Sequence, residues 1–434
     1  MGRVTGSNPV SRTKNRQRGT KYAGVWKCKY QKIIYRRAAY KIYMTILGIE
    51  TSCDETALAL IETRMTDGFL ECRIIQSLIH SQAELHSAYG GVYPSLAKRE
   101  HSRNLIPLLG KILCDYDNIG IIADNTLRDK IDAFRREFAP QNPELFQSVS
   151  RADFLKNIPR IDAIAVTEGP GLEPALWVGI TFARMLGDFW QIPIIPINHM
   201  EGHIVGSLLE SDAPYGTWQK IKYLPLPSIA FLLSGGHTEL VRIDSIGKYE
   251  IIGQTRDDAV GEAFDKVARL LGLPYPGGPH ISMLANKAKE ANIHLPLKLP
   301  RPMINSGDLS FSFSGLKTAV LYAVKKARES GQFNEEYKMS LALEFEQAIA
   351  EVLDSKLRTA IKKIGSRAII IGGGVSANHL LRQTFEKTAN GFGIPIFMPS
   401  RHVSGDNALM IALAGAMQGV SSKKILHAEG TKRL

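Results

Sequence analysis

The chain repeats one arrangement of expected elements in its two halves. Each half has two strands joined by a short polar turn, and later a buried strand that runs into a glycine-rich turn and a helix. In the first half the strands are 45–49, 57–61 and 161–167, with a helix over 175–190; in the second they are 228–233, 239–243 and 368–371, with a helix from 378 to about 387. Equivalent turns lie about 180 to 205 residues apart. This duplication predicts an α/β protein with two related lobes that face a cleft, in which a nucleotide would bind.

A pair of histidines follows the strand candidate at 192–197. His199 and His203 are four residues apart, so in a helical turn both imidazoles point the same way, as in many metal sites. The zinc-peptidase motif HExxH has its glutamate directly after the first histidine, whereas Glu201 comes two positions after it and would point away from the metal. The pattern therefore indicates a metal site, or two ordinary histidines in a short turn, and it disfavours a peptidase.

Two acidic residues, Asp54 and Glu55, lie in the polar turn 50–56 of the first half. The hydroxyl and acid side chains of this turn suit a phosphate or a hydrated cation. The simpler interpretation is a solvent-exposed hairpin turn, and both interpretations stay open at this point.

Other glycine turns suit ligands that approach the backbone closely. Gly169 and Gly171 precede a helix N-terminus, which favours an anion, although many such turns are only connections. Gly277 and Gly278 lie in a proline-rich loop, where a flat ring can lie against bare backbone. In the second half, Ser376 is the expected N-cap of the helix that follows the glycine turn.

Two further acids are candidate ligands. Asp265 lies on an expected helix over 260–271, where i,i+4 ion pairs with neighbouring basic residues explain the acids without any function. Asp406 precedes an expected helix from 408 to about 417. It is either an acid that stabilises the helix N-terminus or a third metal ligand.

The net positive charge is confined to the first 43 residues. The 434-residue chain carries a formal charge of +12, but residues 1–43 hold 12 Lys and Arg and no acid, and the remaining 42 basic residues balance the 42 acidic ones. We expect this leader to be disordered or non-native, with a transit peptide or a nucleic-acid arm as the alternatives. The neutral body lacks the charge that unaided RNA affinity normally needs.

The spacing of the cysteines and the hydropathy of the chain indicate the compartment in which the protein works. The four cysteines form no CxxC pair, and no run of about 18 apolar residues suggests a membrane span. We expect a cytoplasmic protein, or one of the mitochondrial matrix if the leader is a transit peptide. The polar tract at about 115–160 is expected to be a surface insertion, with a helical piece at 127–138.

Seven motifs in order, each weak alone, make residues 44–420 resemble one family. They are Gly48–Thr56, His199–His203, Ser234–Thr238, Gly261–Lys266, Ser310–Gly315, Gly373–Asn378 and Asp406-Asn407. Together they resemble the tRNA N6-adenosine threonylcarbamoyltransferases, the Kae1/TsaD/Qri7 family.

The resemblance implies two RNase H-like lobes of the actin, Hsp70 and sugar-kinase (ASKHA) type with a central nucleotide and metal cleft. We place the N-terminal lobe at 44–200 and the C-terminal lobe at 201–406, with a C-terminal helix at about 407–434 that packs back on the first lobe. The implied reaction moves a threonylcarbamoyl group from threonylcarbamoyl-AMP to N6 of adenosine 37 in tRNAs that read ANN codons, and releases AMP.

The resemblance also assigns roles to residues. His199, His203 and Asp406 would hold one divalent metal, which we expect to be Fe(II), with Zn(II) as the alternative. The residues that would line the site for threonylcarbamoyl-AMP are Leu232, Leu233, Ser234, Gly235, Gly236, Asp265, Gly278 and Asn378. Asp54 and Glu55 are the candidates for polar or proton-handling contacts.

One departure from the wider family, at Leu232, places the chain beside its bacterial and organellar members, because archaeal and eukaryotic members have at this position a tyrosine that reaches the metal. The bacterial branch implies tRNA, a TsaB-like paralogous subunit and a TsaE-like P-loop ATPase as partners, with a homodimer as the alternative. Two other functions stay open on the same architecture: a small-metabolite kinase or ATPase, and a non-catalytic nucleotide-binding subunit.

Overall fold

The computed structural model describes residues 43–114, 116, 119–121, 124–140, 142–149, 157–209, 214–293, 297–400, 403–420 and 426–434. The predictions for the basic leader concern residues 1–43, of which 1–42 lie outside the described part. In the described part no helix is long and apolar enough to cross a membrane.

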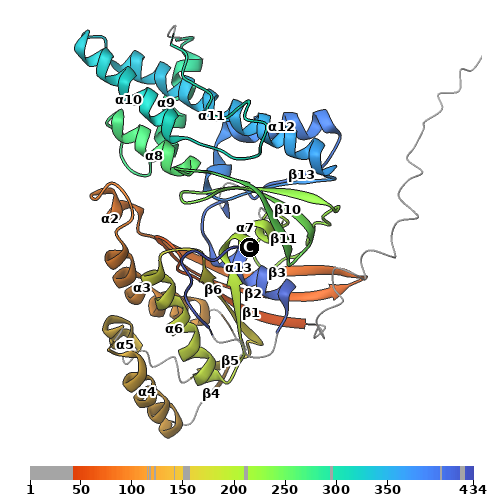
Figure 1. Cartoon of the computed structure of the whole chain (residues 1–434). Helices are drawn as coiled ribbons and strands as arrows, with labels where there is room; N and C mark the ends of the chain where they lie inside the picture. Colours follow the sequence, from red (N-terminus) through yellow and green to blue (C-terminus); the bar gives the residue numbers. More distant parts are fainter. Residues whose placement is uncertain are drawn as a thin grey trace, which may run out of the picture. The chain divides into compact units, whose positions relative to one another are not determined.

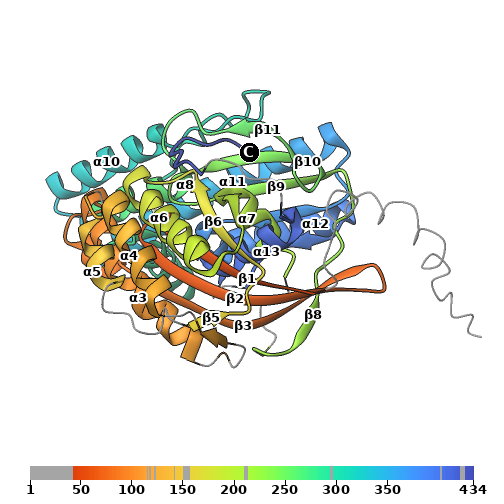
Figure 2. The same ribbon diagram turned by 90° about the horizontal axis from the view of Figure 1, so that it is seen from below.

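The first sheet has six strands in the order β7-β6-β1-β2-β3-β8 (Figures 1 and 2). Its strands are β1 (Tyr43–Glu50), β2 (Glu55–Thr66), β3 (Phe69–Ser81), β6 (Ala163–Gly169), β7 (Ile194–Asn198) and β8 (Trp218–Lys220). The first three form an antiparallel meander, and β6 and β7 continue it in parallel beside β1. β8, which follows the histidine motif in the sequence, pairs with β3 and forms the edge of the sheet.

The second sheet repeats this plan with the order β11-β10-β9-β12-β13. It consists of β9 (Ser228–Leu233), β10 (Thr238–Ser245), β11 (Lys248–Gln254), β12 (Ile369–Gly372) and β13 (Ile396–Phe397). Again an antiparallel meander is followed by two strands in parallel, β12 beside β9 and β13 beside β12. The duplicated α/β lobes predicted from the sequence are confirmed.

Helices cover both faces of the first sheet (Figures 1 and 2). Of the helices of this lobe, α3 (Pro94–Cys114) and α6 (Glu173–Trp190) contact the sheet on one face and α13 (Ala408–Gln418) contacts it on the other. The others are α2 (Ala83–Ser87), α4 (Asp124–Phe138), α5 (Pro143–Val149) and α7 (His199–Gly206), and two short strands of the insertion, β4 (Ile119–Ile121) and β5 (Asn157–Pro159), pair antiparallel. Leu47 and Ile49 of β1 pack with α3 and α6, whereas Gly48 between them faces α13. This alternation is the two-residue period of a strand covered on both sides.

The insertion is tied to the first lobe by aromatic side chains. Phe134 and Phe138 of α4 are buried, and the ring of Phe134 meets Phe189 of α6 edge-on at a centroid distance of 6.3 Å. The segment therefore extends the core of this lobe.

The second lobe has its own core and helices. These are α8 (Val260–Leu270), α9 (Gly277–Glu290), α10 (Ser314–Glu329), α11 (Glu335–Ile364) and α12 (His379–Phe392), with a short 3-10 turn, η2, at Gly374–Ala377. Ser376, the expected cap of α12, lies inside this turn, and the cap is Asn378, whose side-chain oxygen accepts a hydrogen bond from Leu381 N at 3.0 Å. That N-cap prediction is wrong because the chain makes an extra turn before the helix begins.

The last described residues, 426–434, return to the first lobe. The Gly171 amide donates to Gly430 O at 3.1 Å, and Asn198 Nδ2 donates to Arg433 O at 3.1 Å. Gly169 has φ of 150°, and a Cβ on it would overlap Glu429 O. The turn at Gly169 thus accepts this C-terminal segment, which Figure 1 shows ending beside α7.

Candidate metal and nucleotide site

The two histidines lie on the first turns of α7, which begins directly after β7. Asn198 ends the strand, and its side-chain oxygen accepts hydrogen bonds from Met200 N at 2.9 Å and Glu201 N at 3.4 Å. This cap fixes where the helix starts. The imidazoles of His199 and His203 are both buried, with ring centroids 4.7 Å apart.

Asp406 meets both imidazoles from the far end of the chain. Its Oδ1 lies 3.3 Å from His199 Nε2 and 3.2 Å from His203 Nε2. Asp406 lies two residues before the first residue of α13, and this helix packs against α7 and the first sheet. The structure thus brings together the three residues that the sequence proposed as metal ligands.

The chemistry of these three groups fits a metal ion. A metal with ligand bonds of about 2.1 Å holds neighbouring ligand atoms roughly 3 to 3.4 Å apart, close to the two distances above. His203 Nε2 is buried, and among the described residues no group satisfies it with a hydrogen bond of acceptable angle. Such orphaned polar atoms are costly unless a ligand pairs with them.

The protonation of the site also favours a cation. Burial lowers the pKa of His203 and so favours the neutral imidazole, the form in which histidine binds a metal. Burial opposes a charge on His199 too, but the carboxylates of Asp406 and Glu50 outweigh it and raise the pKa of His199 well above its usual value. The two carboxylates therefore stabilise positive charge here, which a divalent cation would supply.

Glu50 is a site residue that the sequence reasoning missed. It is fully buried at the end of β1, and its Oε2 lies 3.0 Å from His199 Nδ1. Thr167 Oγ1 donates to the same oxygen at 2.6 Å, and Ser52 N donates to the other at 2.5 Å. Carboxylates that hold the second nitrogen of a ligating histidine set its tautomer and orientation. The available signal was an acid at the end of an otherwise apolar strand.

Replacing Glu50 by glutamine is expected to weaken metal binding about 10- to 100-fold, because the neutral amide is a poorer partner for the ring that Glu50 orients. Titration of the purified variant with Zn²⁺ against a chelating dye measures this. Glu71→Gln, which alters an acid of β3 that pairs with Arg64, is the matched control. Equal Zn²⁺ affinity in wild type and Glu50→Gln would contradict the assigned role.

Asp54 and Glu55 lie beside the start of β2, and the charge of Asp54 reaches residues of the second lobe. Burial and then the Asp54 charge raise the pKa of Glu55 well above its usual value. Burial also raises the pKa of Asp265 on α8 and of Tyr275, and Asp54 adds to both shifts. The negative charge of Asp54 therefore acts on residues of the second lobe as well as on Glu55.

A buried histidine, His101, contacts the polar turn that carries Asp54 and Glu55. His101 of α3 lies 2.8 Å from Thr56 Oγ1 through Nδ1 and 3.0 Å from Cys53 O through Nε2. Burial lowers the pKa of His101 to about 4, so the imidazole is neutral and can accept at one nitrogen while donating at the other.

The expected nucleotide residues lie along the end of β9 and the helix starts of the second lobe. Leu232 and Leu233 are buried in β9, while Gly235 and Gly236 in the following turn are exposed. A Cβ at Gly235, Gly236 or Gly278 would meet no other atom within 4 Å, so open space faces these three positions. They can accept a ligand against bare backbone.

Two other expected contacts are already hydrogen-bonded within the chain. Asp265 Oδ1 accepts from Gly277 N at 2.7 Å and so holds the start of α9. Asn378 Nδ2 donates to Glu346 Oε1 at 2.7 Å and to Ser282 Oγ at 2.8 Å.

Glu201 is directed to the second sheet rather than to the metal residues. The Tyr249 hydroxyl of β11 donates to Glu201 Oε1 at 2.8 Å. The structure therefore offers this glutamate no place as the base of a peptidase.

Comparison with known proteins identifies the family. The family model of the tRNA N6-adenosine threonylcarbamoyltransferases (TsaD) matches residues 73–121 and 147–413. The chain is 40% identical over 384 residues to the enzyme of that name from Methylobacillus flagellatus, covering 88% of this chain and 95% of that protein. It is 42% identical over 378 residues to the enzyme of the same name from Burkholderia mallei, and the match covers 86% of this chain and 92% of that protein. The chain belongs to the TsaD family.

Membership in the TsaD family confirms the resemblance found in the sequence motifs. The family's reaction depends on a divalent metal, and its substrate is tRNA. The family model leaves residues 122–146 unmatched, and these lie in the segment expected to be an insertion. Among solved structures, full-length HypF in a phosphate- and nucleotide-bound form aligns with a TM-score of 0.45 at 12% identity, over 86% of this chain and 55% of that one.

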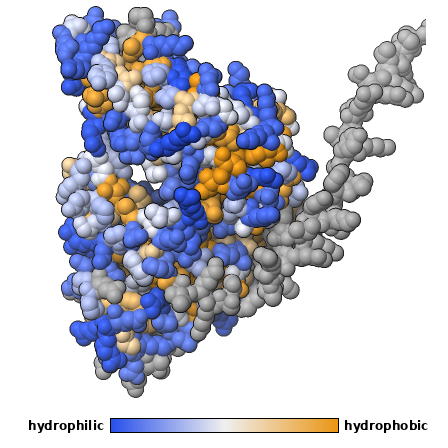
Figure 3. All heavy atoms as spheres, in the orientation of Figure 1, coloured by the Kyte–Doolittle hydropathy of each residue, from blue (hydrophilic) through white to orange (hydrophobic). Residues whose placement is uncertain are grey.

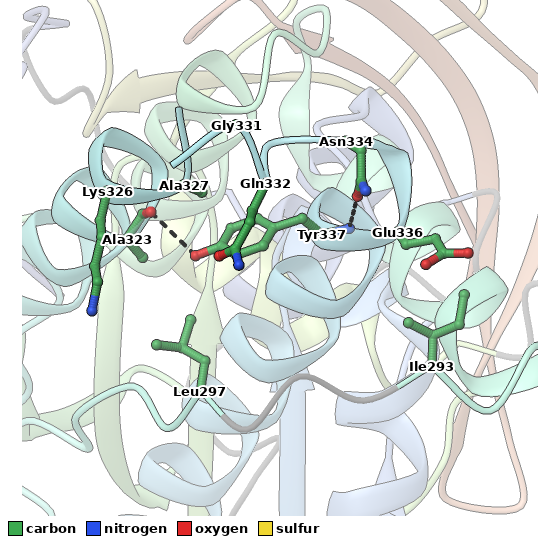
Figure 4. Close-up of a pocket in the computed structure, with 10 residues that line it drawn as sticks. All are labelled: Ile293, Leu297, Ala323, Lys326, Ala327, Gly331, Gln332, Asn334, Glu336 and Tyr337. Carbon is green, nitrogen blue, oxygen red and sulfur yellow. Dashed lines mark hydrogen bonds between the residues drawn. The ribbon is translucent and has the colours of Figure 1, made fainter. Parts of the chain in front are cut away.

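A separate cavity lies in the helices of the second lobe (Figure 4). It measures about 670 Å³ and is lined by residues of α10 and α11, among them Ala323 and Tyr337. The Tyr337 hydroxyl donates to Ala323 O at 3.1 Å across its wall. None of the expected metal or nucleotide residues lines this cavity.

Proposed function

We propose that this chain transfers the threonylcarbamoyl group of threonylcarbamoyl-AMP to N6 of adenosine 37 in tRNA and releases AMP. The observation that carries this proposal is the meeting of His199, His203 and Asp406 in a chain of the TsaD family. A small-metabolite kinase of the same architecture needs phosphate turns but has no use for these three groups.

The metal residues leave coordination positions for a substrate. Two imidazoles and one carboxylate suit Fe(II), which we propose as the native ion, and also Zn(II). The bound ion would supply positive charge for the phosphate and carboxylate of the substrate. The side chain of Leu232, buried in β9, has no oxygen that could take one of the remaining coordination positions.

Side chains and backbone groups of the chain would bind the nucleotide and shape its site. The turn Ser234–Gly236 and Gly278 would take the nucleotide against the backbone, while Asp265 and Asn378 hold the helix starts that shape this wall. In the transfer, N6 of the adenosine forms a bond to the carbamoyl carbon, and the bond from that carbon to the phosphate oxygen breaks. Its electron pair leaves with AMP.

One proton has to leave N6 in this transfer, and we assign it to the carboxylate pair Asp54 and Glu55. Burial beside Asp54 raises the pKa of Glu55, which brings a carboxylate closer to the range where it can accept a proton. No covalent intermediate with the chain is needed.

We further propose that partner subunits complete the RNA site, since the body of the chain is formally neutral. The candidates are a TsaB-like paralogous subunit and a TsaE-like P-loop ATPase, with a homodimer as the alternative. The compartment we propose is the cytoplasm, where tRNA is abundant, or the mitochondrial matrix if the leader is a transit peptide.

The test supplies purified chain with threonylcarbamoyl-AMP and unmodified tRNA, with and without the two partner candidates, and detects modified adenosine by mass spectrometry. A product that disappears on chelation of the metal and returns with Fe(II) or Zn(II) is the expected result. The absence of product in every combination, together with phosphorylation of a small metabolite, would overturn the proposal.

A further inference from the structure

Two tyrosines stack on each other in the exposed segment between α2 and α3. The rings of Tyr89 and Tyr93 have centroids 5.5 Å apart at an angle of 22°. Tyr89 is 63% exposed and Tyr93 is 52% exposed. Two aromatic rings held together at the surface offer a large and rigid area on which a partner can pack.

The tyrosine pair is built on a buried support. Tyr89 N donates to His86 O at 2.9 Å, and Tyr93 N donates to His86 Nδ1 at 3.2 Å. His86 Nε2 lies 3.2 Å from Gln82 Oε1, and Gln82 N donates to Asp54 O at 3.0 Å. The pair is therefore connected by hydrogen bonds to the turn that carries Asp54.

The second lobe reaches the same segment. Arg269 of α8 donates a hydrogen bond to the carbonyl oxygen of Gly90, a residue that lies between Tyr89 and Tyr93 in the sequence. Arg269 lies one helical turn after Asp265, which belongs to the candidate nucleotide site. Figure 1 shows α2 and α8 facing each other, and Figure 3 shows a hollow between the two lobes at this place. The tyrosine pair thus lies at the edge of the site.

Basic side chains lie on the two helices next to the segment that carries the pair. Arg99 and Arg103 are exposed on α3, the helix that begins directly after Tyr93, and they pair with Glu100 at 3.3 and 3.1 Å. Exposed ion pairs of this kind are weak, so these arginines can turn to another anion at little cost. Together with Arg269, which contacts Gly90, the two helices that adjoin the segment carry three guanidinium groups that an RNA phosphate can pair with.

We propose that Tyr89 and Tyr93 form a stacking platform for an unpaired base of the tRNA loop that carries the target adenosine. Proteins recognise single-stranded RNA loops by stacking splayed bases on aromatic rings and by pairing arginines with phosphates. Base stacking on tyrosine contributes affinity for RNA that does not depend on net positive charge. This fits residues 44–434, in which basic and acidic residues are equal in number. The proposal rests on the proposed function, because that function supplies the RNA.

The test compares Tyr89→Ala, Tyr93→Ala and the double variant with Tyr89→Phe and Tyr93→Phe, which keep the rings. Tyr322→Ala, at a 66% exposed position on α10, is the matched control. Fluorescence anisotropy measures the affinity for a labelled unmodified tRNA and for its isolated anticodon stem-loop, with the partner subunits present. Steady-state kinetics then separates KM for tRNA from kcat.

The alanine variants should bind both RNAs about 5- to 100-fold more weakly and raise KM for tRNA in proportion, with kcat and the KM for threonylcarbamoyl-AMP unchanged. The phenylalanine variants and Tyr322→Ala should match wild type. Unchanged RNA affinity in the double variant would overturn the platform, as would loss of a partner subunit from the complex instead of RNA. The binding assay needs no turnover, so it decides this point even if the wild type makes no modified adenosine.

Discussion

Replacing His203 by alanine is expected to abolish metal binding and threonylcarbamoyl transfer while the chain still folds. The change removes one of three ligand groups from a buried site, and the remaining His199 and Asp406 cannot complete it. At a Zn²⁺ concentration of 100 times Kd, the wild type should gain about 2.7 kcal/mol in free energy of unfolding, and the variant should gain nothing.

Titration with Zn²⁺ and denaturation with and without Zn²⁺ measure these effects. His80→Ala, at an exposed position of β3, is the control that should keep both binding and activity. Transfer activity retained by His203→Ala would remove the metal from the proposed reaction, whatever the metal content of the wild type.

Replacing Gly48 by alanine is expected to lower the free energy of unfolding by about 3 kcal/mol and to weaken metal binding about 10-fold. The new Cβ would overlap the carbonyl oxygen of Ala408 and approach Ala412 Cβ to 2.9 Å. Strand β1 would thus push away the first turn of α13. Because Asp406 lies only two residues before Ala408, the same displacement would draw its carboxylate away from the two histidines.

Urea denaturation and Zn²⁺ titration of the variant check both parts of this expectation. Gly391→Ala in α12, where a Cβ meets no atom within 4 Å, is the matched control and should be neutral or stabilise the chain by up to about 1 kcal/mol. A destabilised Gly48→Ala protein with normal Zn²⁺ affinity would show that α13 does not place Asp406.

Much of this arrangement follows from local patterns in the sequence. Strands with glycine turns and helices at equivalent places in both halves predict the two lobes, because the chemistry of each turn is set by a few neighbouring residues. The spacing of His199 and His203 likewise predicts that both side chains lie on the same face of a helix. Asp406 was a candidate only through the resemblance and its place before a helix.

The remaining features depend on contacts between distant segments, which no local pattern encodes. The role of Glu50 is defined by burial beside His199 and Thr167, which come from other strands and helices. Asn378 was expected as a ligand residue, and its amide also serves as a helix cap held by Glu346, a residue of α11. The place of β8 beside β3 depends on pairing at a sheet edge.

The return of the C-terminal segment to α7 has a practical consequence for handling the protein. Arg433 O is held by Asn198, the residue that caps the helix carrying His199 and His203, and Lys432 Nζ lies 2.7 Å from Glu168 Oε1. Any residues attached after Leu434, such as an affinity tag or a fluorescent fusion, would therefore start next to the histidines. Tags for metal-affinity purification carry histidines of their own, so at this end they would compete for the ion being measured.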